Sequence, residues 1–438
     1  MPVNSERKNF QTFALVWFGQ MISLIGSSMT WFAVSIWMWQ LTGRATDLAL
    51  FGFFSQLPQI LMYLISGTIV DRGNRKLLMI VGDLMTGVLT IILAILYFTN
   101  HLQIWHLYLS VAIAGIFEQC QELAFEASIS TLVAPQHYTR ASSMGFLADS
   151  SSWIIGPALA GVLYVTIGLG GIMAIDITTF VIAVTIVLLV RIPQPQRSEI
   201  DSTPSLDIFK ELSFGWQYLT RHSSLLILLI WTSLFWLAHD LGHSLYSAMI
   251  LARSNNDPRI LGSLSAASGI AGVIGAIVMG KFDGFQRQTN GIRLGMLGIG
   301  LSKIIFGLGR VPLVWISAEF ACCFNLPIVG SSTDTIWLNK VSPEIQGRVF
   351  ATRSMVTTIV TSLGYLIAGP LADRFFEPAM MSGGFLAPMF GWLFGTESGS
   401  GIALLYVVSA ISMFCIGLIG YRLPQLNKLE NLVEEKIR

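Results

Sequence analysis

The sequence predicts an all-α polytopic membrane protein in which twelve transmembrane helices form two pseudo-symmetric six-helix bundles. Three observations lead to this fold class. Hydrophobic residues make up 53% of the chain and charged residues only 12%, about half the charged share of a soluble domain. Twelve apolar segments are long enough to cross a bilayer. A short motif also occurs at the same place in each half of the chain.

The apolar segments define the expected helices in order. A membrane-spanning helix needs about 20 mostly apolar residues, and more when it is tilted. Because the number of segments is even, both termini are expected on the same side of the membrane. The first segment is too long for a cleavable signal peptide, so none is expected. The segments are 11–40, 46–70, 77–99, 104–133, 140–165, 168–190, 223–251, 259–281, 291–309, 312–338, 348–374 and 401–421.

The distribution of basic residues predicts the orientation. Of the 26 lysines and arginines, one side of this topology holds only Arg44, Arg253, Arg259, Arg310 and Arg374, and Lys303 falls inside a span. The others lie on the opposite side or at its helix ends, and the positive-inside rule makes that side cytoplasmic. The expected location is the cell (inner) membrane, with both termini in the cytoplasm.

Two segments outside the spans divide the chain. Residues 191–222 contain three prolines followed by an amphipathic run, Leu206–Tyr218, which is typical of a linker that ends in an interfacial helix. The expected domains are therefore 1–190, 191–222 and 223–438. Residues 375–400 form a long outer loop whose role the sequence does not indicate.

The two halves share a motif. Val133-Ala-Pro-Gln-His-Tyr-Thr-Arg140 follows the fourth span, and Val341-Ser-Pro-Glu-Ile-Gln-Gly-Arg348 follows the tenth. In both copies the proline precedes the arginine by five residues. Because the copies occupy equivalent places in the topology, they indicate a duplicated bundle.

Several further blocks carry a family resemblance. They are the loop Ser66-Gly-Thr-Ile-Val-Asp-Arg-Gly-Asn-Arg-Lys76, the first span from Trp17 to Gly26, Ala174-Ile-Asp176, and Gly347-Arg-Val-Phe350. Together they resemble the macrolide-efflux and siderophore-exporter branch of the major facilitator superfamily, over nearly the whole chain. The resemblance implies a secondary active transporter that exports amphipathic organic molecules (drug, macrolide or siderophore-like) by alternating access. Protons are the expected counter-ion.

The loop after the second span supplies the first expected gating residues. Gly67 allows helices 2 and 11 to approach closely, and Asp71 is expected to face the start of helix 11 near Gly347 and Arg348, where free N–H groups favour a carboxylate. Arg72, Arg75 and Lys76 are expected to pair with acidic groups or lipid phosphates. Together these residues are expected to form a cytoplasmic latch that holds one of the two transport states. The alternative is a positive-inside loop alone.

A second gating motif lies in the fifth span. Gly156 and Pro157, with Gly161 one turn later, permit a bend and close packing. The resemblance links this Gly-Pro pair to exporters, and Gly369-Pro370 is its looser counterpart in the eleventh span. An ordinary kinked packing helix is the alternative. Arg140 joins the gating residues through the duplicated motif.

Ionisable residues inside spans are candidate functional residues by default, because an unpaired charge in the bilayer is costly. Glu118, Glu122 and Glu126 form a stripe at i, i+4 and i+8 of the fourth span. Asp334 occupies the position in the tenth span that Glu126 occupies in the fourth. The resemblance places helices 1, 4, 7 and 10 around the central cavity, so these acids are expected to bind substrate or exchange protons. The alternative is pairing with inner arginines such as Arg140, Arg348 and Arg353 at a gate.

The seventh span adds His239, Asp240 and His243. Two histidines at i and i+4 without a third ligand do not indicate a metal site. A hydrogen-bonded or proton-titrating cluster and a near-surface polar end both stay open. Asp149 and Asp176 are equally consistent with structural hydrogen bonds and with transport. Lys303 is expected to extend its ammonium group toward the outer end of its span.

The sequence lacks the common motifs that indicate an enzyme. It has no Walker-type loop, no dinucleotide fingerprint and no His-Glu-x-x-His motif. We therefore expect no enzymatic activity, no cofactor, no bound metal and no nucleic-acid partner. A lysophospholipid or metabolite carrier and a non-transporting sensor or scaffold are the alternative functions, and the sequence does not indicate an oligomeric state.

Overall fold

The computed structural model describes residues 3–72, 74–133, 138–190, 208–281, 285, 287–342, 345–426 and 429. All of the secondary structure in these ranges is helical. The chain forms two compact units. Unit 1 consists of Met1–Met38 and Phe54–Leu206, and unit 2 of Trp39–Phe53 and Asp207–Arg438.

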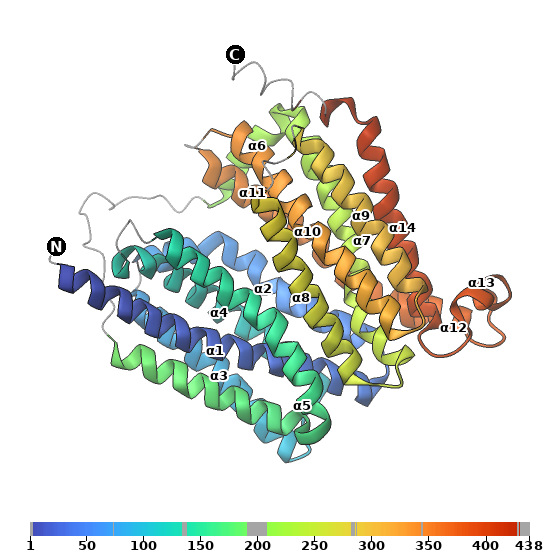
Figure 1. Ribbon diagram of the computed structural model, residues 1–438, viewed down its shortest axis with the longest axis horizontal. Coiled ribbons are helices and arrows are strands. Elements are labelled where there is room, and N and C mark those ends of the chain that lie inside the picture. The colour runs from blue at the N-terminus through green and yellow to red at the C-terminus, as the bar shows by residue number, and fades with distance from the viewer. Residues whose placement is uncertain are drawn as a thin grey trace. The chain divides into compact units, whose positions relative to one another are not determined.

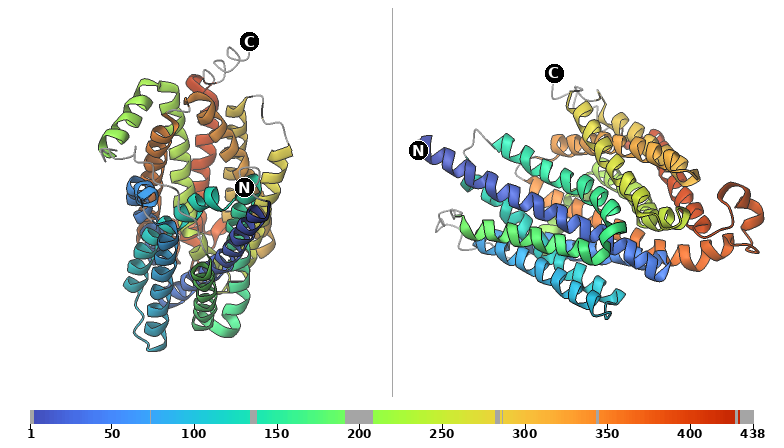
Figure 2. Two further views of the ribbon diagram at one scale, coloured as in Figure 1. Left: turned by 90° about the vertical axis from the view of Figure 1, so that its left-hand side faces the viewer. Right: turned by 60° about the horizontal axis from the view of Figure 1, so that its bottom comes forward.

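Unit 1 contains most of α1 (Val3–Thr42) and α2 (Ala45–Arg72), together with α3 (Arg75–Phe98), α4 (Ile104–Leu132) and α5 (Tyr138–Leu189). Within this unit, α3 packs against α4 and α5. The helices run alongside one another in both views (Figure 1, Figure 2). Phe13, Val16, Met79 and Val187 lie in a buried apolar cluster between them.

Unit 2 contains the remaining helices and the beginning of α2. In this unit α10 packs against α8 and α9, α14 packs against α7 and α9, and α11 packs against α6 and α7. Its buried core includes Trp231, Phe235, Met296 and Trp337. The bounds are α6 (Ile208–Arg221), α7 (Ser223–Arg253), α8 (Pro258–Lys281), α9 (Gln288–Leu308), α10 (Pro312–Lys340), α11 (Gln346–Leu371), the π-helical turn η3 (Ala372–Phe376), α12 (Glu377–Met380), α13 (Ala387–Phe394) and α14 (Ser400–Arg422).

The helices agree with the predicted spans. Within the described ranges, nine helices are long and apolar enough to cross a membrane. One of these, Leu147–Leu189, covers most of two predicted spans, 140–165 and 168–190, which meet where α5 bends at Gly168 with φ 63° and ψ −171°. Glycine adopts this conformation without a steric penalty. We refer to residues 138–167 and 169–189 as the first and second arms of α5.

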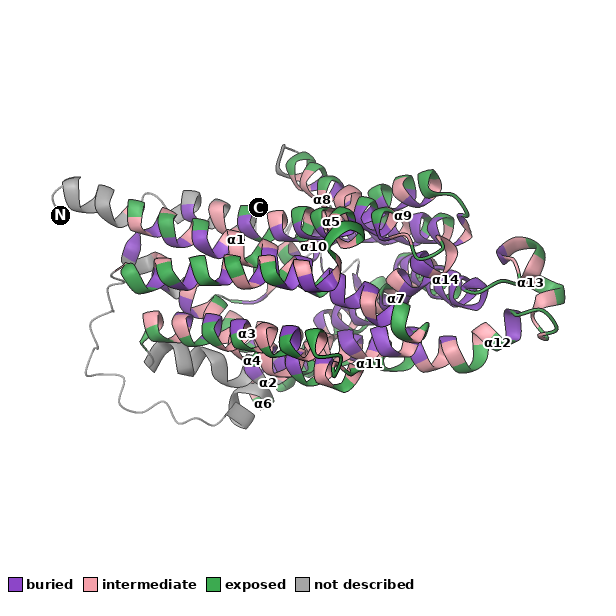
Figure 3. Cartoon of the chain, turned by 90° about the horizontal axis from the view of Figure 1, so that it is seen from below, coloured by how far each residue is buried: buried purple, intermediate pink, exposed green. Residues whose placement is uncertain are grey.

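Exposed apolar side chains mark the faces that meet lipid. On α3, Met79, Gly82, Asp83 and Gly87 are buried, while the opposite face carries large exposed side chains three or four residues apart. Figure 3 shows that exposed residues occur along the length of the helices. A soluble bundle would bury such a stripe, whereas lipid solvates it. The exposed residues of this stripe are Leu77, Val81, Leu84, Val88, Ile92 and Ile95.

The predicted amphipathic segment of the linker forms α6, and its inner face packs against α11. Leu219 is fully buried, and Gly215 lies against the Arg348 carbonyl and the Thr352 hydroxyl. The outward face carries Trp216, which is about half exposed. This helix therefore has a protein partner on one side and an exposed aromatic ring on the other.

Candidate transport site

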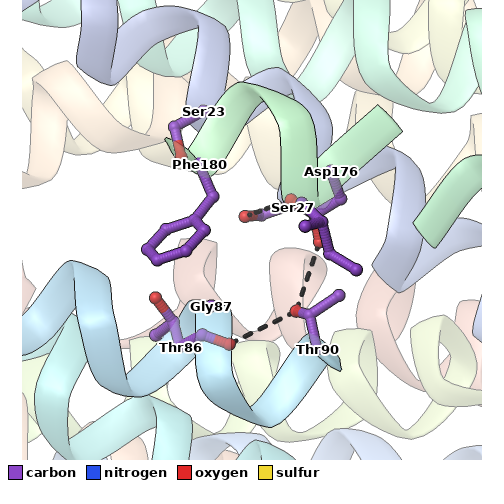
Figure 4. A pocket seen from close by; sticks show the side chains of 8 residues that line it. Ser23, Ser27, Thr86, Gly87, Thr90, Asp176 and Phe180 are labelled. Atoms are coloured by element: carbon purple, nitrogen blue, oxygen red, sulfur yellow. Dashed lines mark hydrogen bonds between the residues drawn. The ribbon is translucent and has the colours of Figure 1, made fainter. Parts of the chain in front are cut away.

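A buried carboxylate, Asp176, lies at the centre of a polar cluster in unit 1. It belongs to the second arm of α5 and is only 3% exposed. Its Oδ1 accepts a hydrogen bond from Ser27 Oγ of α1 at 3.1 Å, and its Oδ2 accepts one from Thr90 Oγ1 of α3 at 3.3 Å. Figure 4 shows these side chains around a small cavity. Two neighbouring helices thus direct hydroxyl groups at one carboxylate.

A second buried acid, Asp83, continues this polar layer along α3. Its Oδ2 accepts a hydrogen bond from Gln20 Nε2 at 2.8 Å, and Gln20 Oε1 accepts one from Gln121 Nε2 at 2.9 Å. The Thr86 hydroxyl donates to the Asp83 carbonyl at 2.9 Å. Among the described residues, the two buried acids of this layer are therefore hydrogen-bonded to neutral groups and not to cations.

The glutamate stripe of α4 lies beside this layer. Glu118 and Glu122 are both exposed although they occupy the middle of a membrane-length helix. Glu118 lies near enough to Asp176 and Glu122 for the charges of these acids to act on it. Glu126 belongs to the same helix, but its side chain lies outside the described residues.

Unit 2 holds the second polar cluster, on α7. His239 Nδ1 lies 2.8 Å from Asp240 Oδ1. The His239 and His243 rings stack with centroids 5.6 Å apart, and Tyr246 continues the stack at 5.9 Å from His243. His243 is exposed and His239 is partly buried. The structure thus brings the three predicted residues of α7 together, and in the described part of the chain no group of three metal-ligating side chains converges.

Lys303 joins the α7 cluster, so the prediction that it extends toward the end of its span is wrong. It is 3% exposed, and its Nζ lies 5.6 Å from the centroid of the Tyr406 ring. Its charge acts on His239, His243 and Glu319. The reason is packing: α9 lies between α10 and α14, so this face of the helix meets protein and not lipid.

Glu319 of α10 is a candidate that the sequence reasoning missed. It is 7% exposed, and its Oε1 accepts a weak hydrogen bond from Cys323 Sγ at 3.5 Å. Ser268 Oγ of α8 lies 2.9 Å from the same sulfur atom. The sequence signal for Glu319 was an acidic residue within an apolar span, because such a residue needs a polar or charged partner.

The residues predicted to form the latch lie at the end of α2 and the start of α3. Gly67, Asp71 and Arg72 belong to the last turns of α2, and Arg140 to the first turn of α5. The surroundings of Gly67 and the side chains of the other three lie outside the described residues. Lys76 is described, and its Nζ donates to the carbonyls of Leu188 at 3.0 Å and Val190 at 2.6 Å. Its partner is therefore the carbonyl end of the second arm of α5, where a cation is favoured. Arg75 has intermediate burial.

The other predicted gating residues lie at the start of α11. The Arg348 guanidinium lies 5.3 Å from the Phe214 ring centroid of α6, and the space that a side chain at Gly347 would fill is open. Asp334 Oδ1 accepts a hydrogen bond from Arg353 at 2.9 Å, and the Arg353 guanidinium also covers the Trp337 ring. For Asp334, the structure therefore contains the pairing with an inner arginine that the sequence left as the alternative.

The Gly-Pro motif lies where α5 meets α1. Gly156, Pro157 and Gly161 are buried. A side chain at Gly156 would collide with Ser28 and come within 3.2 Å of the Ile25 carbonyl. The motif thus permits two helices to pack closely in unit 1. This agrees both with an exporter gating motif and with an ordinary kinked packing helix.

Polar clusters inside membrane-length helices do not by themselves identify a family, and comparison with known proteins decides it. The model of the Major Facilitator Superfamily matches residues 16–365. The chain belongs to this superfamily. It is therefore a multi-pass integral membrane protein and a secondary transporter, and not an enzyme.

Curated relatives in this superfamily include efflux proteins. Macrolide efflux protein A of Streptococcus pyogenes is 28% identical over 370 residues, which cover 83% of this chain and 89% of that protein. The multidrug efflux pump Tap of Mycolicibacterium fortuitum is 21% identical, covering 95% and 96% of the two chains. Their names concern macrolides and multiple drugs, so siderophore export stays a prediction.

Solved structures agree on the fold. The nucleoside transporter NupG matches with a TM-score of 0.68 at 10% identity, covering 94% of this chain and 99% of that one. A bacterial homolog of the human lysosomal transporter Spinster matches with a TM-score of 0.69 at 13% identity, covering 96% and 98%. At these identities the likeness shows the major facilitator fold alone.

Proposed function

We propose that this major facilitator protein exports amphipathic drug-like molecules, macrolides among them, in exchange for protons. The relatives named for macrolide and multidrug efflux support the direction and the substrate class. The observation that carries the coupling is the group of acids in unit 1: Asp83 and Asp176 are buried among neutral partners, and Glu118 lies near Asp176.

Proton exchange follows from the physical chemistry of these acids. A buried carboxylate without a cationic partner is stabilised when it binds a proton, because burial penalises its charge. Glu118 and Glu122 are exposed, and Glu118 lies near Asp176. Where this face of α4 lines a water-filled central cavity, both acids can take up protons and attract a cationic substrate. Alternating access would expose the same acids first to the outer side and then to the cytoplasm.

The second cluster suits a different task in the same cycle. Lys303 places a cation beside Glu319, and His239 and His243 present stacked rings near it. Aromatic rings with a few polar groups are the usual lining of a site for drug-sized molecules. We assign His239, Asp240 and His243 to substrate contact, and the Asp334–Arg353 pair to the cytoplasmic gate.

The expected topology completes the proposal. The halves 1–190 and 223–438, joined by 191–222, would rock about the substrate site during transport. The protein would lie in the cell (inner) membrane with both termini in the cytoplasm. Asp71, Arg72 and Arg140 would close the cytoplasmic side together with Gly347 and Arg348.

Counterflow in proteoliposomes tests the substrate class. Purified protein is reconstituted, loaded with one unlabelled compound and assayed for uptake of the labelled one, using macrolides, siderophores and lysophospholipids in turn. We expect exchange of macrolides, with empty liposomes as the control. Exchange of lysophospholipids alone would replace the proposal with a lipid carrier, and no exchange of any compound would favour a sensor or scaffold.

A further inference from the structure

We propose that the cavity beside Asp176 binds a sodium ion. Five side chains line it with oxygen atoms: Ser23 and Ser27 of α1, Thr86 and Thr90 of α3, and Asp176 of α5. Figure 4 shows them arranged around one small space, with the Phe180 ring on one side. The binding site stands independently of drug export, whereas a role for the ion in coupling rests on the proposed function.

The chemistry of these side chains selects the ion. Hydroxyl and carboxylate oxygens are ligands for hard cations, and transition metals prefer nitrogen or sulfur. A single carboxylate contributes one negative charge, which a monovalent ion neutralises. The hydroxyl groups would then replace part of the hydration shell of the ion. No other charged side chain among the described residues hydrogen-bonds to Asp176, so an ion would supply the missing positive charge.

A further hydroxyl, that of Thr30, faces this carboxylate. Thr30 Oγ1 is buried and interacts with Asp176, in a geometry less favourable than those of Ser27 and Thr90. It would contribute one more oxygen ligand as soon as an ion lies between the two groups.

The hydroxyl protons have other acceptors. Thr90 Oγ1, which donates to Asp176, lies 3.3 Å from the Thr86 carbonyl, and Thr86 Oγ1 already donates to backbone carbonyls of α3. When an ion binds to the Asp176 carboxylate, the Thr90 hydroxyl can donate its hydrogen bond to the Thr86 carbonyl and direct a lone pair toward the ion. Phe180 packs against Gly87 and closes the space beside it, which favours a small ion.

Sodium-dependent stability tests this site in the purified full-length protein. Thermal unfolding is measured in NaCl, KCl and choline chloride at equal ionic strength. We expect NaCl alone to raise Tm in a saturable way, since an ion that binds only the folded state stabilises it. Asp176→Asn should abolish the rise, and Thr90→Val should weaken the apparent affinity at least tenfold. Thr178→Val removes an exposed hydroxyl from the same arm of α5 and should change nothing.

Equal responses to the three salts, or an unchanged sodium response in Asp176→Asn, would overturn the site. Direct binding of radioactive sodium ions to the wild-type protein provides a measurement that does not depend on any variant. Macrolide counterflow is measured in parallel with and without sodium. Sodium binding without counterflow in either buffer would contradict the proposed function, and counterflow without sodium binding would contradict the ion site.

A second inference rests on other residues, at the far end of α11. We infer that Asp373 forms an outer latch that is the counterpart of Asp71, an inference that rests on transport by alternating access. Gly369-Pro-Leu-Ala-Asp373-Arg374 repeats the pattern of Gly67-Thr-Ile-Val-Asp71-Arg72, with a glycine four residues before an Asp-Arg pair.

In the structure, the Asp373 carboxylate caps the N-terminus of α2. Its Oδ1 accepts a hydrogen bond from the backbone N–H of Ala45 at 3.0 Å, and its Oδ2 accepts one from Thr46 at 2.7 Å. These are the first N–H groups of α2, which have no partner within the helix and carry the positive end of its dipole. Gly369 lies directly against the Thr46 backbone, where any side chain would collide. The contact is part of unit 2.

The two copies therefore suit a reciprocal arrangement. An aspartate at the end of α11 caps the start of α2, and Asp71 at the end of α2 is expected to cap the start of α11. Because alternating access closes one side while the other opens, the two contacts would form in alternate states. Neutralising Asp373 should therefore shift the equilibrium toward the outward-open state, and neutralising Asp71 should shift it toward the inward-open state.

Labelling of a cysteine behind the outer contact tests this latch. Ala49 is fully buried and lies beside Gly369, so Ala49→Cys in a variant without the four native cysteines reports opening of the outer side. A membrane-impermeant maleimide should label it severalfold to about tenfold faster in Asp373→Asn, given the usual strength of such contacts. Asp71→Asn should slow the labelling. The exposed acid Glu397 supplies the control, Glu397→Gln.

An unchanged labelling rate in Asp373→Asn would contradict the outer latch. Faster labelling in both aspartate variants would contradict the reciprocal arrangement, since loss of the inner contact should favour closure outside. Circular dichroism and size-exclusion profiles confirm that each variant is folded.

Discussion

Asp176 and Lys303 are ionisable residues of membrane-length helices, and the structure gives them different surroundings. Asp176 is bonded to the neutral hydroxyls of Ser27 and Thr90. Lys303 lies near the acid Glu319 and against the Tyr406 ring. The first arrangement leaves a negative charge for a proton or another cation to neutralise, whereas in the second a positive and a negative charge act on each other.

Glu118 should couple proton movement to transport. Glu118→Gln removes the charge that Asp176 and Glu122 act on while keeping the shape of the side chain. We expect loss of uphill export, with counterflow retained, because counterflow needs binding and alternation but no net proton transfer. Export and counterflow are measured in the same liposomes. Glu397→Gln serves as the matched control, and export at the wild-type rate in Glu118→Gln would refute the assignment.

Lys303 and Glu319 should stabilise the fold as a pair. Lys303→Met removes the positive charge that acts on the buried acid Glu319 and should reduce stability by about 1–3 kcal/mol. The double variant Lys303→Met with Glu319→Gln should lose less than the sum of the single variants, because neither charge is then left alone. Denaturant unfolding in detergent measures this coupling. Additive effects would show that the two residues do not interact.

At the scale of helices, close packing depends on small residues at defined positions. Gly26 of α1 lies against Asp176 and Thr179, and Gly156 of α5 lies against Ser28. Helices in membranes gain stability from such close approach, since lipid supplies no hydrophobic force between them. The polar cluster of unit 1 is therefore positioned by the glycines beside it.

Gly156→Val should separate α1 from the first arm of α5. The added side chain meets Ser28 and the Ile25 carbonyl, and overpacking of this kind costs about 1–3 kcal/mol. We expect a lower Tm and weaker export. Gly145→Ala, at a position of the same arm with open space, should leave Tm unchanged. A normal Tm in Gly156→Val would argue against a tight contact at this place.

The helices could be predicted because each span carries its own signal in length and hydrophobicity. The partners inside the bundles could not. Whether Lys303 meets lipid or Glu319 depends on which face of α9 turns toward α10, and no local pattern in either span encodes that choice. Similarly, Asp83 and Gln20 form a contact between residues 63 positions apart. The α4 stripe and the α7 cluster were recognised because their members lie on one helix.

At the scale of the whole molecule, the orientation is still a prediction from the basic residues. Single cysteines placed at Ser382 and Ser198 test it by labelling from outside intact cells. Ser382 is exposed and should react, whereas Ser198, which lies outside the described residues, should be protected in the cytoplasm. Reaction at Ser198 with protection at Ser382 would reverse the topology.

The central claim is that this protein couples inward proton flow to outward movement of an amphipathic drug. Inside-out membrane vesicles with an acidified lumen test it most directly, because the lumen then corresponds to the outside of the cell. We predict that a radiolabelled macrolide accumulates in vesicles with the wild-type protein and leaves when a protonophore collapses the gradient. Vesicles with Glu118→Gln should not accumulate it. Accumulation that survives the protonophore, or no accumulation at all, would contradict the account.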